Sequence, residues 1–270
     1  MEKQKIKLTQ EKETLLVPLL AKAKENGKEH PILADAKAEE ILGQIEYEFK
    51  DLGVPRQTLI TLTMRAKRLD EYVQEYLARV DHPLVLHLGC GLDSRVLRTK
   101  ASSGRWYDLD YPDVIDLRKK FYDETKHYCM IPSSVTELGW LDMVKENGPA
   151  CIIAEGLLMY LHEAQVRELL ESLQKRFPGS EIAFDAYSHI TASSVNRHPS
   201  IKKTGALIHW GIDKAEEIAS WGSGFRLLEE WYFTDSPDIP HLGGRDRFMF
   251  QTMGLFNAAK KAHRILRFQM

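Results

Sequence analysis

The 270-residue chain carries 37 basic and 39 acidic residues, and this near balance gives no indication of a basic surface for nucleic acid or membranes. Hydrophobic residues make up 43% and charged residues 28%, as in soluble globular proteins, and the longest apolar run, residues 151–161, is too short to span a bilayer. The charged start lacks the apolar segment of a signal peptide, and three cysteines without a CxxC pair are typical of a reducing compartment, so we expect the chain in the cytoplasm.

Helices are expected over the first 82 residues, which we interpret as an N-terminal helical cap on a single domain. In residues 34–49 apolar side chains recur at helical spacing, at Ile41, Leu42, Ile45 and Phe49. A second helix is predicted over residues 55–80, beginning with Pro55, a residue favoured in the first turn. Its repeating apolar residues are Leu62, Leu69, Val73, Tyr76 and Leu77.

After Pro83, short apolar runs alternate with helical patterns. Strands are expected over residues 84–88, 105–110, 127–131, 150–155, 180–187, 225–233 and 264–268. Helices are expected over residues 93–99, 112–124, 136–147, 163–177 and 245–263. This alternation predicts an α/β fold with a mostly parallel sheet and helices on both of its faces.

The predicted domain has three parts after the helical cap. Residues 83–188 would form the ligand-binding core. Residues 189–222 are less regular and contain clustered Ser, His, Asn and Gly, so we interpret them as an inserted cover over the active site. Residues 223–270 would complete the sheet.

The stretch LHLGCGLDSR, residues 86–95, places Gly89 and Gly91 directly after the first predicted strand of the sheet. Ligands of open parallel sheets bind beyond the carboxyl ends of the strands, and glycine permits positive φ and a close approach. A tight turn without a ligand is an equal alternative for an isolated glycine pair. Ser94 stands where a dinucleotide fingerprint requires glycine, and no phosphate-binding GK[ST] follows. Asp93 disfavours a pyrophosphate but tolerates a cationic amino-acid group.

Carboxylates follow at the ends of two later strands. Asp110 lies 19 residues after Gly91, about the distance at which an acid accepts hydrogen bonds from both hydroxyls of a ribose. The alternative for Asp110 is a helix cap before Pro112. Glu155 ends the fourth predicted strand, where an unpaired carboxylate is costly. A ligand ammonium group is a candidate partner for Glu155, and a nearby arginine is the alternative.

Three ordered segments give the chain a more specific resemblance. Residues 86–98, 106–122 and 154–161, read as LHLGCGLDSRVLR, WYDLDYPDVIDLRKKFY and AEGLLMYL, are similar to the leucine carboxyl methyltransferase family. The most similar branch is its bacterial tetracenomycin-polyketide type of O-methyltransferase. The similarity covers roughly residues 55–190, with a looser match over 209–221 and 227–233. It implies a class I methyltransferase fold, which is Rossmann-like, and S-adenosylmethionine as the methyl donor.

The resemblance also assigns residues to the donor. It implies that the turn at Gly89, Cys90 and Gly91 shapes the wall around the methionine part. By the same resemblance Asp110 binds the ribose, and Glu155 lies near the methionyl end. Asp93, in the glycine turn, and Gly156, directly after Glu155, are further candidates for donor binding.

Two further assignments come from the resemblance. Arg65 is similar to an arginine that grips the donor's carboxylate, a task that suits the bidentate guanidinium group. The alternative for Arg65 is a solvated helix face, because Lys67 and Arg68 are its neighbours. Where the family often has an Asp-Leu pair near the adenine, this chain has Ser134 and Val135. We therefore expect an uncharged hydrogen bond to the adenine amine and apolar packing against the ring.

The acceptor side of the site is less defined. Tyr160, one turn after Glu155, and Trp210, in the expected cover, are candidate substrate-binding residues, and packing within the protein is the alternative for each. No catalytic base is identified, since the ten histidines are scattered. HExxH, CxxC, EF-hand and GxSxG patterns are absent, so neither a metal site nor a serine nucleophile is predicted.

These observations predict an S-adenosylmethionine-dependent O-methyltransferase that acts on a small-molecule carboxylate or hydroxyl, polyketide-like or another metabolite, and releases S-adenosylhomocysteine. A carboxylate is ionised at neutral pH and needs no base, whereas an alcohol or phenol needs one. Two alternatives stay open: a nicotinamide-dependent oxidoreductase on a similar sheet, and a donor-binding protein without catalysis. The oligomeric state is left open.

Overall fold

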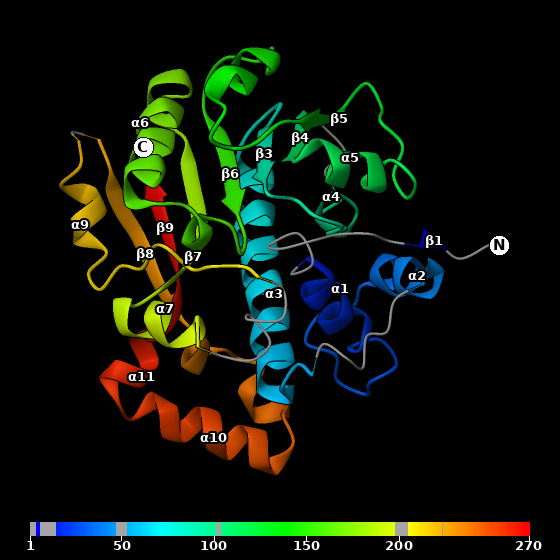
Figure 1. Cartoon of the computed structure of the whole chain (residues 1–270), viewed down its shortest axis with the longest axis vertical. Helices are drawn as coiled ribbons and strands as arrows, with labels where there is room; N and C mark the ends of the chain where they lie inside the picture. Colours follow the sequence, from blue (N-terminus) through cyan, green and yellow to red (C-terminus); the bar gives the residue numbers. More distant parts are fainter. Residues whose placement is uncertain (1–3, 6–14, 47–52, 101–103, 198–204, 223) are drawn as a thin grey trace.

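The computed structural model describes residues 4–5, 15–46, 53–100, 104–197, 205–222 and 224–270 (Figure 1). These residues form a seven-stranded sheet in the order β5-β4-β3-β6-β7-β9-β8. Neighbouring strands from β5 to β7 are parallel, and β9 is antiparallel to both β7 and β8. The strands are β3 (Leu84–Leu88), β4 (Arg105–Asp110), β5 (Tyr128–Pro132), β6 (Ala150–Ala154), β7 (Glu181–Tyr187), β8 (Arg226–Tyr232) and β9 (His263–Gln269).

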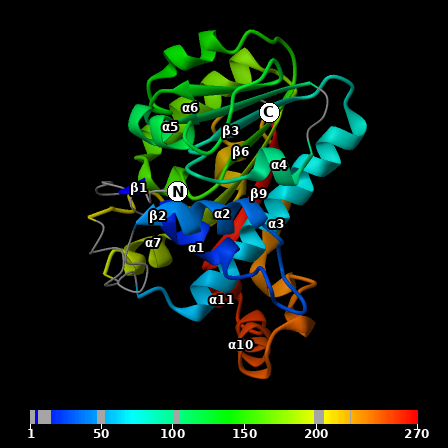
Figure 2. The same ribbon diagram turned by 90° about the vertical axis from the view of Figure 1, so that its right-hand side faces the viewer.

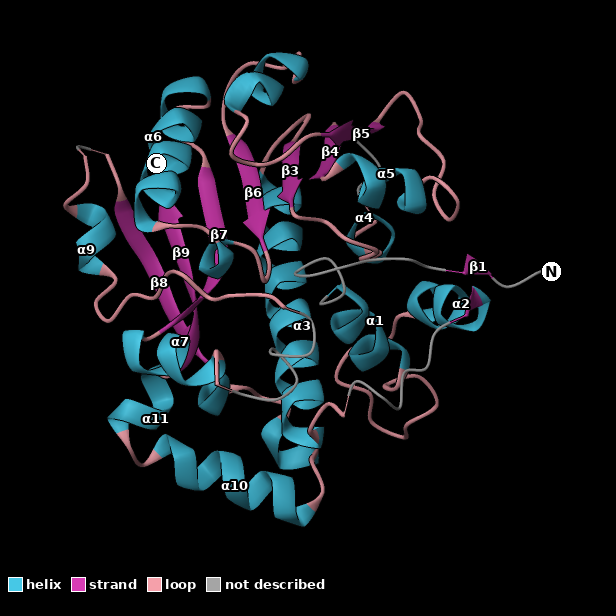
Figure 3. Ribbon diagram, in the orientation of Figure 1, coloured by secondary structure: helices cyan, strands magenta, loops and turns pink. Residues whose placement is uncertain are grey.

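Helices lie on both faces of this sheet and beyond the carboxyl ends of its parallel strands (Figures 1 and 3). The α-helices are α1 (Leu16–Ala23), α2 (Ala36–Gln44), α3 (Arg56–Arg79), α4 (Arg95–Arg98), α5 (Pro112–Arg118), α6 (Glu163–Arg176), α7 (His189–Val195), α9 (Glu216–Ala219), α10 (Gly244–Gly254) and α11 (Asn257–Lys261). Short 3₁₀ helices span Leu138–Met143, Leu158–Tyr160, Phe233–Asp235 and Ile239–His241. Two further short strands, β1 (Gln4–Lys5) and β2 (Ile45–Glu46), pair in parallel with each other.

Separate hydrophobic cores cover the two faces because successive side chains of a strand point in opposite directions. Val85 of β3 packs in the core that contains α1, α2, α3 and α5. Leu84, Leu86 and Leu88 of the same strand pack in the core that contains α6 and α9. Every residue of β3 is buried, which explains why its sequence is apolar at every position except His87 instead of alternating. Figure 2 shows the twisted sheet between these helical layers.

The carboxyl ends of β3, β4 and β6 face three helices (Figure 1). These are α1, the N-terminal part of α3 and the C-terminal end of α7. Asp35 directly precedes α2, and its side chain accepts the N–H of Ala38 and caps this helix. The helix α3 begins directly after Pro55. The N-terminal helices therefore lie beside the carboxyl ends of the strands, where a ligand of this fold is expected to bind.

The strand pattern and the mixed sheet agree with the prediction, but four predicted helices differ in extent or type. The helix expected over 34–49 ends at Gln44, and residues 47–49 lie outside the described part of the chain. The helix expected over 112–124 ends at Arg118. Residues 138–143 form a 3₁₀ helix instead of an α-helix.

The fourth difference concerns the long helix expected over residues 245–263. It is two helices, α10 and α11, separated by an extended residue at Phe256 (φ −115°, ψ 113°) directly after Gly254 and Leu255. Glycine lowers helix propensity at this point. Its last predicted residue, His263, instead begins β9. Residues 198–204 of the expected cover lie outside the described residues. Within the described part of the chain, no helix has both the length and the apolar character needed to cross a membrane.

Candidate active site

Two glycines shape the turn after β3. Gly89 and Gly91 have φ of 64° and 50°, in the left-handed region that favours glycine. Gly89 donates its N–H to the Leu109 carbonyl at 2.8 Å, which joins the turn to β4. A Cβ atom on Gly89 would lie 3.0 Å from the Leu157 side chain, whereas one on Gly91 would lie 3.4 Å from Leu15. The protein itself thus restricts a side chain at Gly89 more than at Gly91.

Asp110 reaches back to this turn from the end of β4. Its Oδ2 accepts the N–H of Gly91 at 2.7 Å, and its Oδ1 accepts the N–H of Tyr111 at 2.8 Å. Burial raises the pKa of Asp110 to about 6, although both backbone donors act in the opposite direction. The helix α5 begins after Tyr111 without a side-chain cap. Asp110 is therefore not the cap of this helix, which was the alternative role for it.

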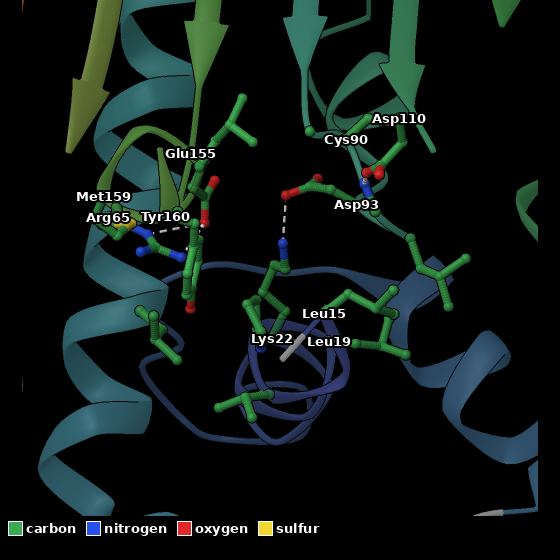
Figure 4. A pocket seen from close by; sticks show the side chains of 18 of the residues that line it. Leu15, Leu19, Lys22, Arg65, Cys90, Asp93, Asp110, Glu155, Met159 and Tyr160 are labelled. Atoms are coloured by element: carbon green, nitrogen blue, oxygen red, sulfur yellow. Dashed lines mark hydrogen bonds and ion pairs between the residues drawn. The ribbon is translucent and has the colours of Figure 1, made fainter. Parts of the chain in front are cut away.

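Adjoining cavities lie at the carboxyl ends of the strands in the described structure. The first, of about 400 Å³, lies between the turns after β3, β4 and β6 and the helices α1, α3 and α7 (Figure 4). The second, of about 360 Å³, extends beside the segment after β5 and the described residues 205–209. Residues that line both cavities are Gly89, Asp110, Tyr111, Leu157 and Tyr160. Asp110 thus stands where the two cavities meet.

The second cavity contains the residues predicted to face the adenine. Ser134 and Val135 line it, directly after β5. The Ser134 hydroxyl forms a 2.9 Å hydrogen bond with the Thr136 hydroxyl, and Val135 is buried. The structure therefore brings both residues to the same cavity as Asp110.

Glu155, which follows β6, is paired with Arg65 and Arg95. Its Oε1 accepts Arg65 Nε–H at 3.1 Å, and its Oε2 accepts from Arg95 at 2.5 Å. Burial alone would raise the pKa of Glu155, but these guanidinium groups outweigh burial and hold it below its usual range. Pairing with arginine, the alternative role for Glu155, is therefore present. Arg65 is buried beside the first cavity rather than placed on a solvated helix face.

Cys90 and Gly156 complete the wall of the first cavity. Burial raises the pKa of the Cys90 thiol well above its ordinary value, so this side chain is neutral. Gly156 has φ of 61°, and a Cβ atom there would lie 3.2 Å from the Arg65 guanidinium. A side chain at Gly156 would therefore press on Arg65.

Lys22 is a site residue that was missed by the sequence interpretation. It forms a buried ion pair with Asp93 of the glycine turn, and Figure 4 shows it pointing from α1 toward that carboxylate. Burial alone would raise the pKa of Asp93, but Arg98, at 2.8 Å, and Lys22 hold it well below its usual range. A signal was present, since Leu15, Leu19 and Lys22 recur at helical spacing and place a lysine on an apolar face.

The two candidate acceptor residues lie in different environments. Tyr160 lines both cavities. Trp210 lines neither and is buried in the core on the α6 side of the sheet. Its ring centroid is 6.1 Å from that of Phe184 and 6.3 Å from that of Trp221. This placement corrects the prediction that Trp210 binds substrate, because the indole packs against core rings instead of facing a cavity.

The described residues contain no group of three or more His, Cys, Asp and Glu side chains arranged to hold a metal ion.

The chain matches the family model for leucine carboxyl methyltransferase over residues 16–174. It is 38% identical over 264 residues to the tetracenomycin polyketide synthesis O-methyltransferase TcmP of Streptomyces glaucescens, with 97% of this chain and 98% of TcmP covered.

The chain belongs to the leucine carboxyl methyltransferase family.

It is therefore an S-adenosylmethionine-dependent O-methyltransferase, as the sequence predicted, and the nicotinamide alternative is not favoured. A second family relative, the S-adenosyl-L-methionine-dependent methyltransferase dpfgK of Gibberella zeae, is 29% identical over 280 residues, with 95% of this chain and 94% of the relative covered.

Solved structures bear on the fold alone, because their sequence identities are low. A DUF574 family protein from Streptomyces avermitilis has a TM-score of 0.58 at 11% identity, with 95% of this chain and 96% of that chain covered. A SAM-dependent methyltransferase from Archaeoglobus fulgidus has a TM-score of 0.52 at 13% identity, with 77% and 93% covered. These likenesses and the strand order confirm the Rossmann-like class I methyltransferase fold of this family member.

Proposed function

We propose that this enzyme transfers the methyl group of S-adenosylmethionine to an oxygen of a small molecule with a largely apolar body, namely a polyketide-like carboxylic acid or an acidic phenol. The observation that carries the proposal is the first cavity, which has charged groups at the strand ends and apolar side chains from three helices facing them. The family relative TcmP, named for polyketide synthesis, supports an acceptor of this kind.

We assign the donor to the strand-end side of the two cavities. Asp110, where the cavities meet, would accept hydrogen bonds from both ribose hydroxyls. Ser134 and Val135 would face the adenine in the second cavity. Arg65 would hold the carboxylate of the methionine part, since a guanidinium keeps further N–H donors after its pairing with Glu155. Glu155 would hold the ammonium group of the methionine part. The bound donor supplies an electrophilic methyl group on a positively charged sulfur.

The acceptor would occupy the helical side of the first cavity. Its apolar side chains come from α1 and the segment before it, α3 and α7: Leu15, Val17, Pro18, Leu19, Leu62 and Val195. Burial of apolar surface against such a wall stabilises a complex by about 25 cal/mol per Å². An aromatic or polyketide-like body fits this wall better than a charged metabolite does.

The charge state of the lining favours an acceptor that is already ionised. His87 is buried with its Nε2 2.9 Å from Arg95, and burial and that guanidinium lower its pKa, so it stays neutral without a free acceptor atom toward the cavity. Glu155 and Asp93 are ion-paired. Among the described residues that line the first cavity, His87 is the one histidine, and it is paired. Positioning and exclusion of water are therefore the contributions of this cavity to methyl transfer.

The test is incubation of the enzyme with methyl-labelled S-adenosylmethionine and three acceptors: an aromatic polyketide carboxylic acid, its phenolic analogue without the carboxyl group, and a peptide that ends in leucine. We expect S-adenosylhomocysteine to form with the first, and the product's label to be released by mild alkali, because esters hydrolyse and methyl ethers do not. Stable label on the phenolic analogue would select the phenol. Label on the peptide alone, or on nitrogen, would contradict the proposal.

A further inference from the structure

Asp185, near the carboxyl end of β7, is completely buried and joins three separate parts of the chain. Its Oδ1 accepts the N–H of Gly156, in the turn after β6, at 2.6 Å. Its Oδ2 accepts from Arg65 of α3 at 2.7 Å and lies 2.9 Å from Nε2 of His263, the first residue of β9. Asp185 itself does not line the first cavity, whereas Arg65 and Gly156 do.

The charges of this cluster fix its hydrogen bonds. Burial alone would raise the pKa of Asp185, but Arg65 and His263 outweigh burial and lower it. Since an ionised carboxylate only accepts hydrogen bonds, His263 carries its hydrogen on Nε2. Burial lowers the pKa of His263, so its ring is neutral at neutral pH. Ring centroids of Tyr187 and Phe233 lie 4.5 and 4.7 Å from that of His263 and restrict its orientation.

The guanidinium of Arg65 is consequently held on two edges. Glu155 accepts from Nε, and Asp185 accepts from the terminal nitrogen Nη1. A long arginine side chain has many rotamers, and one carboxylate leaves the plane of the guanidinium free to turn about that contact. A second carboxylate on a different nitrogen selects one orientation. The same Asp185 also fixes the turn at Gly156, so arginine and turn are held relative to each other.

We propose that Asp185, supported by His263, is a positioning residue that orients Arg65 and the Gly156 turn to receive the carboxylate of the methyl donor. This inference rests on the donor-binding role that the proposed function gives to Arg65. Asp185 acts through Arg65, because it contacts neither the cavity nor the reacting atoms. Its loss should therefore affect donor affinity more than the rate at saturating donor.

The variant Asp185→Asn tests the positioning. The amide oxygen can still accept the N–H of Gly156, but the amide nitrogen is a donor and would face the Arg65 guanidinium. We expect the dissociation constant of S-adenosylhomocysteine, measured by calorimetry, to rise about tenfold, as for loss of one charge-assisted hydrogen bond. The KM for S-adenosylmethionine should rise in parallel, while kcat stays within about threefold.

A double-mutant cycle with Arg65→Met separates positioning from general destabilisation. If Asp185 acts through Arg65, Asp185→Asn should add little to the effect of Arg65→Met. The matched control is Glu181→Gln, at the other end of the same strand, which removes a carboxylate paired with Arg267 and should leave donor affinity unchanged. His263→Phe keeps a ring between Tyr187 and Phe233 and gives a second route if Asp185→Asn does not fold. It should weaken binding about threefold, and only when Arg65 is present.

The outcomes are distinguishable. Weakened affinity that depends on Arg65 supports the inference. The positioning role alone is overturned if Arg65→Met weakens binding but the Asp185 and His263 variants do not. It is also overturned if the Asp185 and His263 variants weaken binding as much in the Arg65→Met background as in the wild-type background. If Arg65→Met leaves binding unchanged, the donor-binding role of Arg65 fails, and the inference fails with it.

Discussion

Donor binding should depend on pH through Asp110. Burial raises the pKa of this carboxyl to about 6, so about a tenth of the molecules carry it ionised at pH 5 and nearly all at pH 7.5. Only the ionised form has acceptors for both ribose hydroxyls while it also holds the N–H groups of Gly91 and Tyr111. The apparent dissociation constant of S-adenosylhomocysteine should thus rise about tenfold from pH 7.5 to pH 5, equivalent to about 1.4 kcal/mol.

The same shift has the opposite consequence for folding. An aspartate of the unfolded chain ionises near pH 4, about two pH units below Asp110 in the folded protein. Between those values the folded state keeps a proton that the unfolded state has lost, so this group's contribution to stability falls as pH rises through the window, by about 3 kcal/mol in total. Hydrogen bonds from a bound ribose would offset part of that cost.

The assay is calorimetry of S-adenosylhomocysteine binding at pH 5, 5.5, 6 and 7.5 in two buffers with different ionisation enthalpies. At pH 5.5 binding should release roughly three-quarters of a proton. The control is Asp110→Asn, which should bind weakly and lose the proton release. Asp110→Ala should also weaken binding, by about tenfold to a hundredfold, but it removes two backbone hydrogen bonds as well and lowers stability. An affinity that is constant from pH 5 to 7.5, or a proton release retained by Asp110→Asn, would refute the reasoning.

Three further predictions concern the walls of the first cavity. Gly91→Val should abolish donor binding, measured by calorimetry, because a branched side chain would occupy the ligand's space; a folded variant that binds normally would make the turn merely structural. Gly156→Ala should cost about 1–2 kcal/mol of stability from its left-handed backbone and weaken the donor by displacing Arg65; unchanged affinity in a correctly folded variant would contradict this. Lys22→Met should lower the free energy of unfolding in urea by about 1–3 kcal/mol, because Asp93 loses one of its cations; an unchanged midpoint would show that the ion pair does not stabilise the fold.

The central strands of the sheet could be predicted from sequence because they are largely buried on both faces. The run LVLHL becomes β3 with every residue buried, and the boundaries of β3 and β4 agree with the prediction. Helix extents were less predictable. An α-helix and a 3₁₀ helix use similar residues, so the sequence of residues 138–143 did not show which of the two helix types would form. Leu255 and Phe256, which follow Gly254 at the end of α10, are apolar, and periodicity alone did not reveal the break between α10 and α11.

The candidate site shows the same division between local and long-range information. Gly89, Gly91, Asp110 and Glu155 could be placed because each lies at or just after the end of a recognisable strand. The partners of these residues could not be placed, since ion pairs join segments that are distant in the chain. Lys22 and Asp93 are 71 residues apart, and Arg65 and Asp185 are 120 residues apart. Trp210 was misassigned for a related reason, because whether an indole faces a cavity or a core depends on the packing of distant strands.

This division determines how variants of the site should be interpreted. The side chain of Arg98 is buried and pairs with Asp35, Asp70 and Asp93, so its removal leaves buried carboxylates with fewer cations and costs about 3–5 kcal/mol. Loss of activity in such variants follows from loss of folding and says little about ligand contact. Gly91 has space beside it, and Asp110 borders both cavities. Changes in affinity at Gly91 and Asp110, measured in variants that remain folded, therefore carry the information about where the donor binds.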